Sequence, residues 1–204
     1  MTRTAIRIER GLPDHLRAEA AALYWQAFGG KLGRVMGPEP RAMAYLARVM
    51  RSDHAITAVD GGELVGLAGF KTAKGAFAEG GWPDMRATYG LIGAGWRMAL
   101  LAALSHEVDN QRFLVDGICV ARDHRGRGIG RALVEMLCAE AEARGHDAIR
   151  LEVIDTNIRA RALYERLGFR VIKHDRLGLL RHAFGFESAA TMVCELAEHN
   201  APRP

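Results

Sequence analysis

The chain has few cysteines and no long apolar run. The three cysteines, Cys119, Cys138 and Cys194, sit among apolar neighbours, form no CxxC pair and have no histidine at metal-ligand spacing. We therefore expect buried free thiols, a reducing compartment and no bound metal. The most apolar stretch, residues 91–104, contains Arg97 and is shorter than the roughly 20 apolar residues that span a bilayer, and no apolar run near the start resembles a signal peptide. These absences predict a cytoplasmic protein without a membrane association.

Clustered positive charge is also missing. The 204 residues include 28 Lys and Arg against 24 Asp and Glu, a net charge of +4, and no run of five or more basic residues occurs. Because affinity for a phosphate backbone needs clustered cations, we expect no nucleic-acid partner. With 49% hydrophobic and 25% charged residues, the composition excludes a disordered, collagen-like or coiled-coil chain and is typical of a globular protein.

The hydrophobic pattern predicts strands and helices throughout the chain. Strands are expected at residues 5–9, 55–59, 64–70, 113–120, 149–154, 169–173 and 191–196. Helices are expected at residues 16–28, ending at Gly29-Gly30, from Pro40 to Met50, and at 128–144 and 158–167; residues 83–108 fit one helix or two. Asp60-Gly61 predicts a hairpin. Since no repeat or low-complexity linker occurs, we predict one α/β domain at residues 4–197 with a mixed sheet.

One glycine-rich turn has a composition suited to binding an anion. Residues 125–130 read RGRGIG and lie between a predicted strand and the N-terminus of a helix, where the first N–H groups are unpaired and the helix dipole favours negative charge. Taken alone, the turn also fits a purely structural role. It lacks the Lys-Ser/Thr end of a P-loop, and its GxGxG spacing, which five intervening residues separate from Val120, departs from the dinucleotide fingerprint. A pyridine-nucleotide enzyme is thus the weakest interpretation.

A second motif lies downstream of the turn, and the two motifs taken together indicate a function for the turn. It has the spacing N-x-x-A-x-x-x-Y-x-x-x-G-F, formed by Asn157, Ala160, Tyr164, Gly168 and Phe169. The turn itself has the spacing R-x-x-G-x-G, formed by Arg125, Gly128 and Gly130. Together the two motifs resemble the GNAT superfamily of acyl-CoA-dependent N-acyltransferases. Glu152, twelve residues before Tyr164, has the spacing of the bacterial protein N-terminal acetyltransferases within that superfamily.

The resemblance implies an α/β (α+β) fold with a mixed, mostly antiparallel central sheet and helices on both of its faces. Two parallel strands would splay apart, and the pantetheine arm of acetyl-CoA would lie in the gap. Gly117 fits the bulge that such splaying needs, or close packing. The implied cofactor-binding residues are Ile118, Cys119, Val120, Arg125, Gly126, Arg127, Gly128, Ile129, Gly130, Arg131, Asn157, Ala160 and Tyr164. A main-chain N–H near Val120 would polarise the thioester carbonyl.

Three residues are candidates for proton transfer. Tyr164 occupies the position that commonly protonates the leaving thiolate in the family, and its ordinary pKa of about 10 keeps it protonated at neutral pH; it also fits a core aromatic. Glu152 is the first candidate for the base that takes a proton from the amine, although a lone carboxylate on a strand is often only solvated. Asp116, beside the expected bulge, is the rival base. Asn157 is expected to cap its helix.

We therefore predict an N-acetyltransferase that moves an acetyl group from acetyl-CoA to a primary amine by direct attack, without an acyl-enzyme, because Cys119 lacks a positioned histidine. The acceptor stays open between a small amine, an antibiotic-like molecule and a protein N-terminus or lysine. The alternative is a non-catalytic acyl-CoA-binding regulatory module, against which the presence of both Tyr164 and Glu152 counts.

Two segments are longer than the family pattern requires. Residues 74–112, with a helical insertion at about 81–110, and residues 175–188 fit either a cover over the acceptor site or a dimer contact, so a homodimer stays open. The aromatic side chains of Trp82, Trp96, Phe184 and Phe186 fit either the core or an acceptor pocket.

Overall fold

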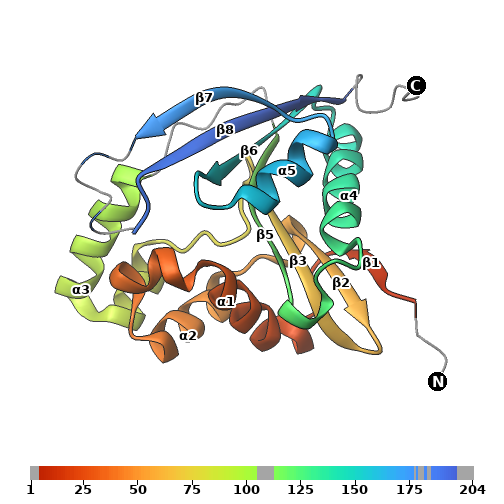
Figure 1. The fold of residues 1–204 in the computed structure, drawn as a ribbon. Coiled ribbons are helices and arrows are strands. Elements are labelled where there is room, and N and C mark those ends of the chain that lie inside the picture. Colours follow the sequence, from red (N-terminus) through yellow and green to blue (C-terminus); the bar gives the residue numbers. More distant parts are fainter. Residues whose placement is uncertain (1–4, 105–112, 177, 179–181, 183–184, 197–204) are drawn as a thin grey trace, which may run out of the picture.

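One eight-stranded sheet organises the chain (Figure 1). The computed structural model describes residues 5–104, 113–176, 178, 182 and 185–196. The sheet has the order β1-β2-β3-β5-β6-β8-β7, with the short β4 paired to β3 off this path. Its strands are β1 (Arg7–Arg10), β2 (Ala55–Asp60), β3 (Glu63–Thr72), β4 (Gly75–Ala76), β5 (Phe113–Val120), β6 (Ala148–Ile154), β7 (Arg170–Arg176) and β8 (Ser188–Glu195).

All strand pairs are antiparallel except β5 with β6. That parallel pair is in register only at Phe113 with Ile149 and at Leu114 with Arg150. A parallel connection needs a crossover, and α4 supplies it between β5 and β6. The expected mixed, mostly antiparallel sheet with one splayed parallel pair is confirmed.

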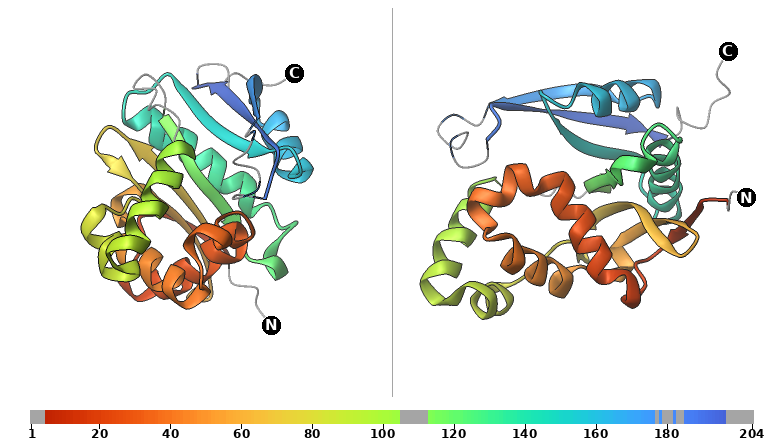
Figure 2. Two further views of the ribbon diagram at one scale, coloured as in Figure 1. Left: turned by 90° about the vertical axis from the view of Figure 1, so that its left-hand side faces the viewer. Right: turned by 60° about the horizontal axis from the view of Figure 1, so that its bottom comes forward.

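Helices cover both faces of the sheet (Figures 1 and 2). They are α1 (Arg17–Met36), α2 (Glu39–Val49), α3 (Trp82–Leu104), α4 (Ile129–Ala143) and α5 (Ile158–Arg166). In Figure 1 the strands β2 and β3 lie between α1 and α4. The apolar stripe of α4, which includes the fully buried Leu133 and Leu137, packs on one face of the sheet, and α1 and α2 pack on the other. Burial of each such leucine stabilises the fold by about 1.5–3 kcal/mol.

Helix α1 is longer than predicted. The expected end at Gly29-Gly30 is wrong, because the helix continues to Met36. Val35 and Met36 at its end are buried against α2 and α3, and this burial outweighs the roughly 1 kcal/mol by which each helical glycine is disfavoured. Gly29 also makes room for the indole of Trp25, whose Cε2 would lie 2.9 Å from an added Cβ.

The inserted segment is two helices in succession rather than one. Within Trp82–Leu104, Gly90 has φ 71° and ψ 178°, which interrupts the helix, as its glycine content allowed. Residues 105–108 of the expected helix, and much of the segment 175–188, lie outside the described residues. The remaining elements match their predicted positions to within a few residues, and the two-residue strand β4 was not predicted.

Close packing at the centre of the sheet gives a stability prediction. A Cβ added to Gly69 would lie 2.5 Å from Cδ1 of the fully buried Phe77, so Gly69→Ala is expected to lower the free energy of unfolding by about 1–3 kcal/mol. Gly30 is exposed on α1 with nothing within 4 Å of an added Cβ, so the control Gly30→Ala is expected to raise it by about 0.5–1 kcal/mol. Chemical denaturation followed by circular dichroism measures both, and equal stability of the two variants would contradict the packing.

Candidate functional site

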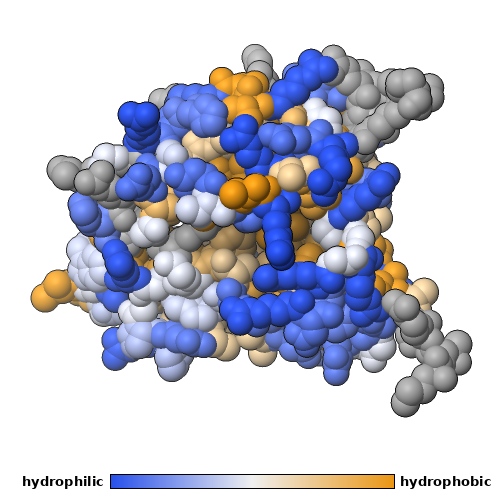
Figure 3. Space-filling view, in the orientation of Figure 1, coloured by the Kyte–Doolittle hydropathy of each residue, from blue (hydrophilic) through white to orange (hydrophobic). Residues whose placement is uncertain are grey.

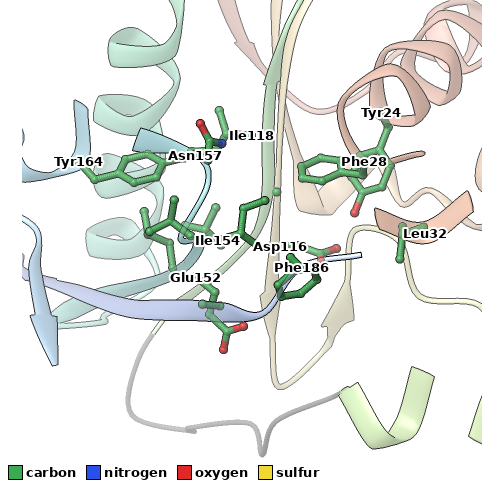
Figure 4. Close-up of a pocket in the computed structure, with 15 residues that line it drawn as sticks. Tyr24, Phe28, Leu32, Asp116, Ile118, Glu152, Ile154, Asn157, Tyr164 and Phe186 are labelled. Atoms are coloured by element: carbon green, nitrogen blue, oxygen red, sulfur yellow. The ribbon is translucent and has the colours of Figure 1, made fainter. Parts of the chain in front are cut away.

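The strands β5 and β6 separate after two residue pairs, and a cavity of about 240 Å³ lies where they part (Figure 4). Beyond that point β5 stays paired to β3 as far as Val120, and β6 stays paired to β8 as far as Ile154. Each strand is thus held on its outer side alone. Figure 3 shows a hollow in this face of the molecule, with apolar residues inside it and polar residues around it.

A bulge in β5 helps to part the strands. The register with β3 pairs Val115 with Phe70 and Gly117 with Gly69, so Asp116 is the extra residue. After the bulge the alternation of side chains is reversed, and Gly117 faces α1. A Cβ at Gly117 would lie 2.8 Å from Cζ of Phe28. Both expectations for Gly117, a bulge and close packing, therefore hold at one place.

The parted strands leave main-chain groups directed into the gap. The N–H of Ala121 donates to the carbonyl of Val65 at 2.9 Å, so alternation along β5 directs the N–H groups of Ile118 and Val120 away from β3. The N–H of Asp155 donates to the main-chain carbonyl of Ser188 at 3.1 Å. In the same way, alternation along β6 directs the N–H of Ile154 toward the gap. Such groups need a partner, which a ligand or water can supply.

The glycine-rich turn presents further unpaired donors. Gly126 and Gly128 have φ values of 78° and 82°, a conformation that favours glycine. No side chain caps α4, and its first internal bond runs from the N–H of Ala132 to the carbonyl of Gly128 at 3.0 Å. The N–H groups of residues 129–131 therefore face outward at the positive end of the helix dipole. Gly130 lies against α5, because an added Cβ would be 3.3 Å from Leu163.

The arginines of the turn are engaged with the protein. Arg127 pairs with Asp60 of the β2–β3 turn at 3.0 Å, Arg131 pairs with Glu135 at 2.7 Å, and the Arg125 Nε donates to the carbonyl of Val120 at 3.2 Å. His124 Nε2 also lies 3.7 Å from the carboxylate of Asp60. The turn thus offers an anion its main-chain N–H groups first. Asp60, which the sequence marked only as part of a hairpin, anchors the glycine-rich turn from another part of the chain.

The three candidates for proton transfer all line the cavity, as does Asn157. Tyr164 of α5 is 9% exposed, and burial raises its pKa to about 12. Glu152 of β6 is exposed and pairs with Arg150 at 3.1 Å. Asp116 of β5 is also exposed, and desolvation by the protein atoms around it raises its pKa. Its carboxylate accepts a hydrogen bond from the N–H of Ala78 at 3.2 Å.

Two further predictions concern local structure. Asn157 caps α5, since its Oδ1 accepts a hydrogen bond from the N–H of Ala160 at 3.3 Å, as expected. Cys119 is buried on the α1 side of β5, where its Sγ donates to the carbonyl of Leu67 at 3.6 Å and burial raises its pKa to about 12. A thiol in that state is a poor nucleophile. Cys138 and Cys194 are likewise free and buried.

Sequence reasoning missed one wall of the cavity. Tyr24, Phe28 and Leu32 of α1, spaced four residues apart, line it opposite α5. The helical spacing of Tyr24 and Phe28 fits a core stripe, and Leu32 lies beyond the predicted end of the helix. Only the gap beside Gly117 distinguishes a cavity wall from a core. Phe186 lines the same cavity, as one of the two expectations for it allowed, whereas Phe184 lies outside the described residues.

Two kinds of site are not found in the described parts of the chain. Those residues contain no group of three or more His, Cys, Asp or Glu side chains that could hold a metal ion. None of the helices described combines the length and apolar character that crossing a membrane requires.

An opened pair of parallel strands with an anion-binding turn at one end and titratable side chains at the other defines a site for an elongated, phosphate-bearing ligand with a reactive end. The family model described as acetyltransferase (GNAT) family matches residues 18–169, well over half of the chain. The chain belongs to this family.

Its relatives and structural neighbours are acetyltransferases. The streptothricin acetyltransferase of Streptomyces lavendulae is 41% identical over 92 residues, covering 45% of this chain and 48% of that protein. The ribosomal protein bS18-alanine N-acetyltransferase of Escherichia coli K12 is 50% identical over 52 residues, covering 26% and 35%. The chain thus spans less than half the length of these relatives.

Solved structures share the fold over nearly the whole chain. A crystal structure described as an acetyltransferase has a TM-score of 0.64 at 18% identity, covering 93% of this chain and 99% of the other. The yncA protein of Salmonella typhimurium, solved with its cofactor acetyl-CoA, has a TM-score of 0.58 at 16% identity, covering 98% and 99%.

Proposed function

We propose that this protein transfers an acetyl group from acetyl-CoA to a primary amine. The observation that carries the proposal is the arrangement, along one path, of the glycine-rich turn that follows β5, the gap between β5 and β6, and the cavity that Tyr164 lines. That path has an anion site at one end and proton-transfer groups at the other, which is what an acyl-CoA and an amine acceptor require.

The residues along the path fit acetyl-CoA. The main-chain N–H groups from Gly126 to Arg131 hold the pyrophosphate, with the dipole of α4 behind them, while the N–H of Arg125 donates to the carbonyl of Arg122. The N–H groups of Ile118 and Val120, directed into the gap, bind the pantetheine arm and polarise the thioester carbonyl. Cys119 links Ile118 to Val120 in β5, and Asn157, whose Oδ1 accepts the N–H of Ala160, lines the cavity at the start of α5.

The chemistry needs a base and an acid. An alkyl ammonium with a pKa of about 10.4 is mostly protonated at neutral pH, so a carboxylate that takes up its proton increases the attacking species. Glu152 is the first candidate for that base and Asp116 the rival. Tyr164 gives its proton to the leaving thiolate, and its pKa of about 12 ensures that the proton is present at neutral pH.

Transfer is direct. In an acyl-enzyme mechanism a side chain of the protein would carry the acetyl group, and Cys119 is the thiol nearest to the gap. Its burial, its raised pKa and its hydrogen bond to Leu67 keep it from that role. The amine nitrogen therefore attacks the thioester carbonyl itself, the C–N bond forms and the C–S bond breaks.

We extend the proposal to organisation and place. Residues 4–197 act as one acetyltransferase domain with an insertion at about 81–110, and the single sheet supports this. Cytoplasmic location is supported by the three free, buried thiols, which fit a reducing compartment.

Release of CoA thiol tests the reaction. With acetyl-CoA and a panel of small amines, peptides and amino acids, we expect amine-dependent release of free thiol and an acetylated product by mass spectrometry. Calorimetry should show binding of acetyl-CoA and CoA but not of NAD, because the turn departs from the dinucleotide fingerprint. Tight binding of NAD, or no acetyl transfer to any amine, would overturn the proposal.

The acid is tested by Tyr164→Phe. Loss of the hydroxyl is expected to lower kcat by about 10²–10⁴-fold, because the thiolate then leaves without a proton, while affinity for CoA stays nearly unchanged. The matched control is Tyr45→Phe, since Tyr45 is also buried with a pKa of about 12 but lies in the cluster between α2 and α3. An unchanged kcat at saturating substrates in Tyr164→Phe would remove this residue from the mechanism.

The base is tested by comparing Glu152→Gln with Asp116→Asn. We expect Glu152→Gln to lower kcat by about 10²–10⁴-fold and to alter the pH profile of kcat, because a glutamine cannot accept the proton. Asp116→Asn is expected to keep the wild-type profile. The reverse result would make Asp116 the base and leave Glu152 as the partner of Arg150.

A further inference from the structure

The side of the cavity opposite Tyr164 is apolar. Tyr24 and Phe28 have ring centroids 4.5 Å apart and form a continuous aromatic surface, which Leu32 extends along α1. Figure 4 shows these side chains opposite Tyr164, with Asp116 and Phe186 between the two sides. An acceptor that reaches the thioester must lie along this wall.

Charge in the cavity has one sign. The described residues that line it include two carboxylates, Asp116 and Glu152, and no Lys, Arg or His. Glu152 already pairs with Arg150, whereas the carboxylate of Asp116 accepts a hydrogen bond from the neutral N–H of Ala78. Desolvation raises the pKa of Asp116, while the charges of Lys71 and Glu79 act on that pKa in opposite directions. Asp116 therefore offers a carboxylate to an incoming cation.

The size of the cavity limits the acceptor. About 240 Å³ is less than the roughly 300–1,000 Å³ of pockets that enclose a drug-sized ligand. The thioester end of acetyl-CoA also occupies part of this space. The part of the acceptor inside the cavity is thus an ammonium group on a small carbon skeleton.

We propose that the acceptor is a small primary amine with an apolar skeleton, whose ammonium group is held by Asp116 and whose skeleton packs on Tyr24, Phe28 and Leu32. This inference rests on the proposed function and specifies its substrate class. A carboxylate next to the amine would lie near Asp116 and Glu152, and the described residues that line the cavity include no Lys, Arg or His to receive it. A second ammonium at the far end of a skeleton that packs on Tyr24, Phe28 and Leu32 would lie away from Glu152 (Figure 4) and would lose its water against the apolar wall. Amino acids with a free carboxylate, and diamines, are therefore poor acceptors.

Matched ligands test the class by binding as well as by turnover. Calorimetry of the protein saturated with CoA is expected to show phenethylamine binding at least about tenfold more tightly than L-phenylalanine, and pentylamine at least about tenfold more tightly than 1,5-diaminopentane, since each second member adds one unpaired charge. L-Phenylalaninamide, which lacks the carboxylate charge, should recover most of the lost affinity. The same order is expected in kcat/KM for thiol release from acetyl-CoA.

The role of Asp116 is tested by Asp116→Asn, in which the amide oxygen can still accept the N–H of Ala78. Affinity for phenethylamine is expected to fall at least about tenfold, with KM rising more than kcat falls, because the ammonium loses its counter-charge. The control Asp14→Asn removes the same charge from the surface, where the side chain is 92% exposed, and should change affinity less than twofold.

Failure of this inference differs from failure of the proposed function. The substrate class is wrong, while acetyl transfer stands, if L-phenylalanine or a short peptide binds as tightly as phenethylamine, or if 1,5-diaminopentane binds as tightly as pentylamine. The same holds if Asp116→Asn binds phenethylamine like the wild type. If phenethylamine binds as expected but no amine releases thiol, the proposed function fails alone.

Discussion

The separation of β5 from β6 is the constraint on which the rest of the structure depends. Two strands that start as a parallel pair and then part leave a row of main-chain donors and acceptors without partners, and buried backbone groups cannot stay so. The outer neighbours β3 and β8 hold each strand in place, so the gap cannot close by collapse. A ligand with its own amide and carbonyl groups can replace the missing strand, and the N–H groups at the start of α4, which no side chain caps, are available to its far end.

Glycine lets the helices approach this opening closely. Gly117 admits Phe28 to the surface of β5, and Gly130 brings the first turn of α4 against Leu163 of α5. Both contacts border the gap, the first on the side proposed for the amine acceptor and the second on the side proposed for acetyl-CoA. The same residue type that gives the turn its positive φ values thus sets how near α1 and α5 come to the parted strands. Larger side chains at these two positions would fill the space that the ligands need.

Local patterns in the sequence predicted most of the helices and strands. The turn at residues 125–130 and the cap at Asn157 follow from short motifs whose residues are neighbours in the chain, whereas the splayed parallel pair of β5 and β6 was expected from the resemblance to the family. The acceptor half of the site could not be predicted in that way. Its wall on α1 has the helical spacing of any core stripe, and the anchor at Asp60 is 67 residues from Arg127. Such contacts depend on tertiary packing. Tertiary packing also stabilises the helical conformation of α1 beyond its glycines, as far as Met36.

The titratable groups of the cavity differ in their electrostatic surroundings, and this difference separates their roles. Tyr164 and Tyr24 are both buried with raised pKa values, and the charge of Asp116 raises that of Tyr24 further, so both hydroxyls stay protonated at neutral pH. Only a hydroxyl near the leaving sulfur can use its proton, which leaves Tyr24 as part of the wall. Of the two carboxylates, Glu152 already shares the guanidinium of Arg150, whereas Asp116 accepts a hydrogen bond from the neutral N–H of Ala78. A carboxylate held by a neutral donor gains more from an arriving cation than one that is already paired with a cation. In the mechanism proposed above, the amine therefore meets Asp116 as a binding group before it loses its proton.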